Sequence, residues 1–94
     1  MFDIRRAEDG TVKLVGRFDA AQVEARRADF DAITSSCVLD LAELDYVSSA
    51  GLGVLFATLK RLTEGGGALK LINLKPHIRE LFQIAGFDRI FAIE

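Results

Sequence analysis

The chain opens with two stretches in which hydrophobic and polar residues alternate. Residues 2–5 follow this pattern, and residues 12–14 repeat it after a turn-forming segment at 8–10. A period of two is typical of a strand with one face buried, and acidic residues followed by glycine favour a turn. The pattern therefore predicts a β-hairpin whose second strand ends at Gly16.

The next two segments are predicted to be a helix and a buried strand. Asp19 stands three residues before Gln22, a spacing close to that of a capping box, and this predicts a helix over residues 20–33. The almost continuous apolar run at 37–41 predicts a central strand buried on both faces. Residues 42–47 are expected to form a loop that leads to a pair of serines.

A second helix is predicted from about residue 50 to residue 64, where a glycine triplet ends it. Its core-facing positions follow helical spacing and are Leu52, Leu55, Phe56, Leu59 and Leu62. The opposite face is largely small and apolar where charged residues would be expected, and it consists of Gly53, Val54, Ala57 and Arg61. Such a face suits the close approach of a partner protein.

The remainder of the chain predicts one more strand–helix–strand unit. Residues 68–72 form an apolar run, Pro76 suits the first turn of a helix, and residues 90–93 predict a short edge strand. A right-handed crossover predicts parallel pairing between 68–72 and 37–41. We therefore predict a single α/β domain over residues 1–94, in the order ββαβαβαβ, with a mixed sheet of four to five strands and about three packed helices.

Two serines and two glycines mark the join between the central strand and the second helix. Ser48 or Ser49 is suited to accept hydrogen bonds from the first turn of the helix. Gly51 and Gly53 each cost roughly 1 kcal/mol relative to alanine within a helix. They indicate either a tight strand-to-helix turn or bare backbone that something approaches closely. The carboxyl end of a central strand is where open α/β sheets place their binding sites.

Composition excludes several classes of function. The formal net charge is −2 and no cluster of lysine and arginine stands out, which argues against a nucleic-acid surface. Cys37 is the one cysteine and cannot form an internal disulfide, while His77 has no companion ligand at metal-binding spacing, so we expect no metal and no cofactor. Without an apolar run of about 18 residues or a signal-peptide pattern, we expect a cytoplasmic domain that does not insert into a membrane.

Catalytic motifs are missing as well. The segment Gly51-Leu52-Gly53 lacks the further glycine and the lysine of phosphate-binding loops. Ser49 does not stand in a nucleophile elbow, and the sequence offers it no evident triad. We therefore expect a binding module and not an enzyme.

Four blocks of the sequence resemble the STAS domain family, of the anti-sigma-factor antagonist type. Residues 16–20 resemble the family's turn into the first helix, residues 38–41 its central strand, and residues 84–91 its ending. The segment Ser48-Ser49-Ala50-Gly51-Leu52-Gly53 resembles the signature Asp-Ser-(Ser/Thr/Ala)-Gly-Leu-Gly, with Ser48 in place of the aspartate. Together the blocks cover nearly the whole chain in the family's order.

The resemblance implies a role in partner switching. Ser49 matches the serine that the family phosphorylates, and Ser48 is a secondary candidate. Unphosphorylated members bind an anti-sigma factor that is also a serine-protein kinase of the histidine-kinase-like ATPase fold, which frees the sigma factor; phosphorylation breaks the complex and a serine phosphatase restores it. The expected partner surface consists of Asp19, Ser48, Ser49, Ala50, Gly51, Gly53, Val54, Ala57 and Arg61.

The alternative function is a constitutive regulatory STAS subunit of a membrane transporter complex. In that case the same helix face would dock permanently on a transporter component, without phosphorylation. The hydroxyl that the sequence keeps at position 49 favours the switched antagonist.

Overall fold

One five-stranded sheet, in the order β1-β2-β3-β4-β5, forms the frame of the fold. A computed structural model describes all residues from Met1 to Glu94. The elements in chain order are β1 (Phe2–Arg6), β2 (Val12–Phe18), α1 (Ala20–Ala25), α2 (Arg27–Asp31), β3 (Cys37–Val47), α3 (Ser49–Glu64), β4 (Leu69–Ile72), α4 (Pro76–Ile84), a 3₁₀ turn (Phe87–Arg89) and β5 (Ala92–Ile93). The predicted α/β class and the predicted element order are confirmed.

The predicted strand pairings are also found. β1 and β2 form an antiparallel hairpin, and the three remaining pairs, from β2–β3 to β4–β5, are parallel. Each parallel pair is joined by a crossover that carries helix, so consecutive strands become neighbours in the sheet. β5 is the short edge strand expected near the end of the chain.

β3 is longer than predicted, because residues 42–47 belong to the strand and not to a loop. Between the pairs Lys13–Asp40 and Val15–Glu43, β2 advances two residues while β3 advances three. Between the pairs at Gly16 and Arg17, β3 again takes one extra residue. Each extra residue bulges the strand and breaks the alternation of buried and exposed positions. The second half of β3 therefore lacks the sequence pattern by which a strand is recognised.

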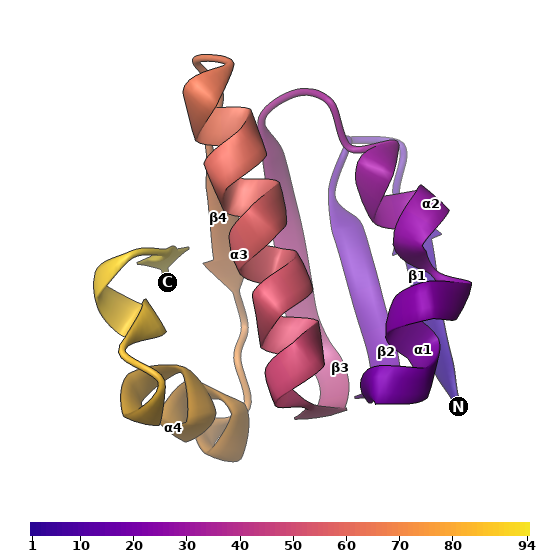
Figure 1. Cartoon of the computed structure of the whole chain (residues 1–94), viewed down its shortest axis with the longest axis vertical. Helices are drawn as coiled ribbons and strands as arrows, with labels where there is room; N and C mark the ends of the chain where they lie inside the picture. The colour runs from indigo at the N-terminus through magenta and orange to yellow at the C-terminus, as the bar shows by residue number, and fades with distance from the viewer.

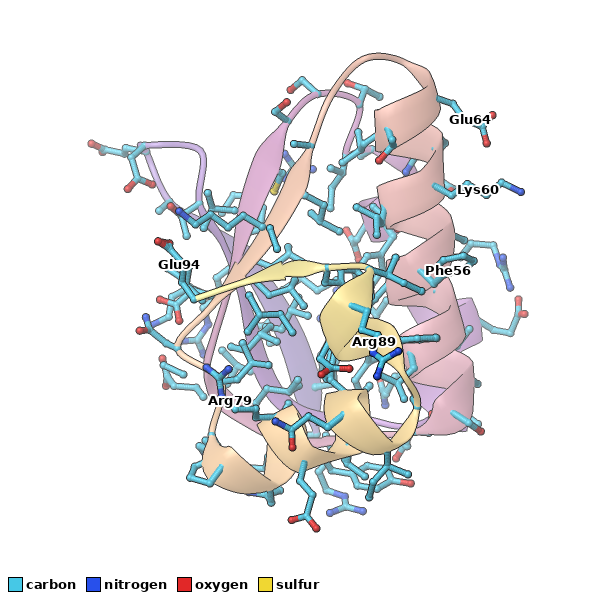
Figure 2. The ribbon with its side chains drawn as sticks, turned by 90° about the vertical axis from the view of Figure 1, so that its left-hand side faces the viewer. Phe56, Lys60, Glu64, Arg79, Arg89 and Glu94 are labelled. Atoms are coloured by element: carbon cyan, nitrogen blue, oxygen red, sulfur yellow. The ribbon has the colours of Figure 1, made fainter.

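The helices cover one face of the sheet. Figure 1 shows α1, α2 and α3 in front of the strands, and Figure 2 shows no helix on the opposite side. The prediction that residues 37–41 are buried on both faces is therefore wrong, because Val38 and Asp40 are only half-buried while Leu39 and Leu41 are fully buried. The open face carries cross-strand ion pairs, including Lys13 with Glu43 at 2.5 Å.

Gly16 lies within β2, although the sequence predicted that the strand ends there. Residues with a side chain rarely adopt its backbone φ of +94°, and a Cβ at this position would lie 2.2 Å from the carbonyl oxygen of Met1. Glycine therefore allows the irregularity that precedes Arg17 without ending the strand. β2 continues to Phe18 and so reaches the edge of the sheet where α1 and α3 begin.

The helix predicted over residues 20–33 is interrupted at Arg26, whose φ of −114° and ψ of 11° are not helical. The Arg26 guanidinium donates to the Phe2 carbonyl oxygen at 3.3 Å and to Asp3 at 3.0 Å, and it also pairs with Asp29. The break thus fastens the helical segment to β1, a contact that local spacing could not reveal.

The core lies between the sheet and the helices. Phe18 is fully buried, with its ring centroid 4.5 Å from that of Phe2 and 5.2 Å from that of Phe30. Phe56 (Figure 2), predicted to face the core, is instead 36% exposed. Its ring stacks on that of Phe87 with the centroids 5.7 Å apart. Thr58 is buried on α3, and its hydroxyl is satisfied there by donating to the Val54 carbonyl oxygen at 2.9 Å.

The C-terminal half closes the fold as predicted. Pro76 occupies the first turn of α4, and Ile78 and Phe82 bury the inner side of this helix. Cys37 is half-buried, and this burial raises the pKa of its thiol, as expected for a residue that acts as a small hydrophobe. None of the helices has the length and apolar character needed to cross a membrane.

Candidate functional site at the start of α3

The serine pair lies where the carboxyl ends of β2 and β3 meet the starts of α1 and α3. Phe18 and Val47 are paired in the sheet, and the Ser48 N–H donates to the Phe18 carbonyl oxygen at 2.9 Å. Asp19 caps α1 from the residue after β2, with its carboxylate accepting from the Gln22 N–H at 3.3 Å. The structure therefore brings Asp19 and the serine pair to one edge of the sheet, although they are about thirty positions apart in sequence.

Ser48 is the N-cap of α3. Its backbone is extended, with φ of −79° and ψ of 169°, and its Oγ accepts from the Gly51 N–H at 3.1 Å. The side chain is half-buried. The hydroxyl of Ser48 therefore satisfies one of the N–H groups that a helix leaves free in its first turn.

Ser49 has a different environment. It is the first residue of α3, it is exposed, and its hydroxyl has no hydrogen-bond partner within the protein. A negative charge at a helix N-terminus is favoured by the helix dipole and by the remaining free N–H groups. Position 49 can therefore accept an anionic group without losing an existing hydrogen bond.

We expect the replacement Ser48→Ala to lower the free energy of unfolding by about 0.5–2 kcal/mol, because an N-cap hydrogen bond is lost. Ser49→Ala is the matched control and should leave the free energy of unfolding within about 0.5 kcal/mol of the wild type, as for other exposed positions. Urea denaturation followed by circular dichroism measures both. Equal losses for the two variants would show that Ser48 is not the residue that caps α3.

The two glycines of the site serve different purposes. Gly51 is buried, and a Cβ there would lie 2.9 Å from the Phe18 carbonyl oxygen and 2.9 Å from Val47 Cγ2. Gly53 is exposed, and a Cβ there would meet nothing within 4 Å. Of the two alternatives left open by the sequence, Gly51 fits the tight turn, where α3 packs on the sheet, and Gly53 presents bare backbone to the outside.

The outer face of α3 is small and accessible along its first half. Ala50, Gly53 and Ala57 are exposed, and Val54 is half-buried. Arg61, a member of the expected partner surface, is exposed but already donates to the carbonyl oxygens of Ile33 and Phe30, at 2.6 and 2.9 Å. The Arg61 guanidinium therefore caps the carbonyl oxygens at the end of α2.

Sequence reasoning missed the contacts that fix the end of β3 to the start of α4. The Lys75 ammonium pairs with the Asp45 carboxylate, and His77 Nε2 lies 2.7 Å from the Asp45 carbonyl oxygen. The hydrogen bond from Lys75, together with its charge, lowers the pKa of Asp45. These partners lie about thirty residues apart, so no local pattern in the sequence indicates them.

Comparison with known proteins connects this chain to a family. The family model described as "Mlab, STAS domain" matches residues 2–93. BtrV of Bordetella bronchiseptica, named as a candidate anti-sigma factor antagonist, is 46% identical over 81 residues, which cover 85% of this chain and 70% of BtrV. The anti-sigma-B factor antagonist of Bacillus subtilis is 33% identical over 98 residues, covering 97% of this chain and 87% of the relative.

Solved structures share the fold. The anti-sigma factor antagonist SpoIIAA of Bacillus, in its unphosphorylated form, aligns with a TM-score of 0.77 at 22% identity, covering 100% of this chain and 88% of SpoIIAA. An anti-sigma factor antagonist from Mycobacterium paratuberculosis aligns with a TM-score of 0.80 at 23% identity, covering 99% and 83% of the two chains. The sequence matches and the shared fold together show that this chain belongs to the anti-sigma factor antagonists of the STAS domain family, which are regulators and not enzymes.

Proposed function

We propose that this chain is an anti-sigma factor antagonist whose binding is switched by phosphorylation of Ser49. The unphosphorylated form binds an anti-sigma factor that is also a serine-protein kinase, in the cytoplasm, and so frees the sigma factor. Phosphate transfer to Ser49 breaks the complex, and a serine phosphatase restores the antagonist. The observation that carries the proposal is the exposed, unbonded hydroxyl of Ser49 beside a neighbour already engaged as the helix cap.

Electrostatics explain how such a switch would act without unfolding the domain. A phosphoryl group adds about −1.5 to −2 charge, which the N-terminus of α3 tolerates. The same charge lies next to the bare, apolar surface at Gly53 and Val54. A partner that packs on this surface would have to remove water from a dianion or meet it with a cation, so phosphorylation weakens the complex unless the partner supplies that cation.

Two findings from relatives support this proposal. BtrV and the Bacillus subtilis relative are named as antagonists of anti-sigma factors, which gives the class of partner. SpoIIAA, which shares the fold, has been solved in a phosphorylated form with a TM-score of 0.70 to this chain as well as in an unphosphorylated form. Phosphorylation is therefore compatible with the fold that this chain adopts.

Intact-mass spectrometry tests the modification directly. The purified chain is incubated with ATP and the anti-sigma factor kinase from its own organism, and we expect one adduct of about 80 Da, the mass of one phosphoryl group. Fragmentation should place this adduct on Ser49. Ser49→Ala should abolish it and Ser48→Ala should retain it; the reverse result would move the site to Ser48.

We expect Ser49→Asp to weaken binding of this chain to the anti-sigma factor kinase by about 5- to 150-fold, a coupling of about 1–3 kcal/mol. Ser49→Ala keeps the surface neutral and should bind like the wild type. Isothermal titration calorimetry measures the three dissociation constants. Equal affinity for all three proteins, together with co-purification of an ATPase subunit of a membrane transporter, would instead support the constitutive transporter subunit.

A further inference from the structure

A groove between α2 and α3 continues the outer face of α3. The two helices lie side by side in Figure 1, and the hollow between them has a volume of about 180 Å³. Phe30 of α2 and Val54, Ala57 and Thr58 of α3 line its interior. Val54 and Ala57 also belong to the surface proposed above to receive the anti-sigma factor, so the groove extends that surface toward α2.

The interior of the groove offers no free polar group. Phe30 is buried and stacked on Phe18, and Val54 is half-buried. The Thr58 hydroxyl is already engaged with the Val54 carbonyl oxygen. A volume of about 180 Å³ over a floor without free polar groups is large enough for one large aliphatic or aromatic side chain of a partner.

The rim of the groove carries two guanidinium groups and one carboxylate, those of Arg27, Arg61 and Asp31. Arg61 uses two of its five donors on backbone carbonyl oxygens, and its remaining donors are free. Arg27 pairs with Glu24 at 2.8 Å, but both side chains are more than half exposed, and such exposed pairs contribute little. The two guanidinium groups outnumber the single Asp31 carboxylate, so the rim is net positive and Arg27 can exchange its weak pair for a carboxylate of a partner.

We propose that the groove between α2 and α3 is the anchor site for the anti-sigma factor, and that it receives one large apolar side chain flanked by an acidic residue. This inference rests on the proposed function, because the occupant is the same partner. The apolar side chain would fill the hollow beside Ala57, and the carboxylate would face Arg27 and the free donors of Arg61. The groove would then define which partner is bound, while Ser49 defines when it is bound.

Two substitutions test the groove from different directions. Ala57→Phe fills the hollow at an exposed position, and Arg27→Glu replaces the rim cation by an anion. We expect each to weaken binding to the purified anti-sigma factor kinase by at least about tenfold, the loss typical of an interface anchor. Arg27→Glu should also reduce the dependence of the affinity on salt concentration. The unfolding midpoint of each variant confirms that it is folded.

Arg89→Glu provides the matched control. Arg89 is exposed in the 3₁₀ turn (Phe87–Arg89) of the C-terminal segment, which packs with α4 and contributes nothing to the groove between α2 and α3 (Figure 2). This charge reversal should leave the affinity unchanged if the partner sits in the groove. A loss at Arg89 without one at Ala57 would overturn the proposal and place the partner on the C-terminal side of the fold.

The remaining outcomes separate the groove from the phosphorylation switch. If Ser49→Asp weakens binding but neither groove variant does, the switch stands and the groove assignment is wrong. If the unmodified wild type does not bind the kinase, both are wrong. If sedimentation shows a dimer of this chain that Ala57→Phe dissociates, the occupant is a second copy and the proposed partner chemistry is wrong.

Discussion

The replacement Phe18→Ala is expected to lower the free energy of unfolding by about 3–5 kcal/mol, as for other buried aromatic residues. Phe18 is fully buried and lies in a stack between Phe2 of β1 and Phe30 of α2. Its removal leaves a cavity that three elements would have to close together. Urea denaturation should show a lower midpoint with an unchanged slope, because the stability changes while the surface exposed on unfolding does not. The loss is a large part of the total free energy of unfolding of such a domain, which is about 5–15 kcal/mol.

Phe56→Ala is the control for this prediction. Phe56 is 36% exposed and contacts Phe87 through one stacked pair, and such a pair contributes about 0.5–1.5 kcal/mol beyond the area that it buries. The loss at Phe56 should therefore be clearly smaller than the loss at Phe18. Comparable losses would mean that the C-terminal segment, and not the Phe2–Phe18–Phe30 stack, is the main source of core stability.

The second large effect is expected at Gly51. Gly51→Ala should lower the free energy of unfolding by about 1–3 kcal/mol, the usual cost of overpacking. The added methyl group would lie 2.9 Å from a backbone oxygen of Phe18, which cannot move away as a flexible side chain would. Thermal and urea denaturation measure the loss.

Gly53→Ala supplies the opposite sign on the same helix. Its methyl group meets open space, so the variant should gain up to about 1 kcal/mol from helix propensity. A gain at both glycines would contradict the packing described for the start of α3.

The double variant Phe18→Ala/Gly51→Ala tests whether the losses at the two positions are coupled through their direct contact. Removing the Phe18 ring relieves one of the three close contacts of the new methyl group, but the Phe18 carbonyl oxygen and Val47 Cγ2 remain. The two losses should therefore be less than additive, as expected for residues that touch.

Local signals in the sequence were sufficient for much of the fold. The hairpin, the parallel pairing of β4 with β3 and the helix that begins at Pro76 follow from alternation, proline and crossover rules, each of which acts over a few residues. The capping role of Asp19 and a serine cap at position 48 or 49 were also accessible, because a cap and its helix are adjacent in the chain; the structure assigns the cap to Ser48.

The parts that could not be predicted depend on contacts between distant residues. The bulges in β3 are set by its register with β2, so the alternation that would show residues 42–47 as strand is absent. Phe56 has the spacing of a core residue, but whether its side chain is covered depends on where residues 87–91 pack. At the site, sequence spacing could not separate Gly51 from Gly53, because the difference lies in what each Cα faces across the fold.

The different environments of the two adjacent serines have an evolutionary consequence. Ser48 holds the helix cap, and the hydroxyl of Ser49 takes part in no hydrogen bond of the fold. Mutations at position 49 can therefore be selected for their effect on partners without first crossing a stability threshold. Lineages that share this fold can gain, lose or mimic a charge at that position in single steps, while the neighbouring residue keeps the protein folded.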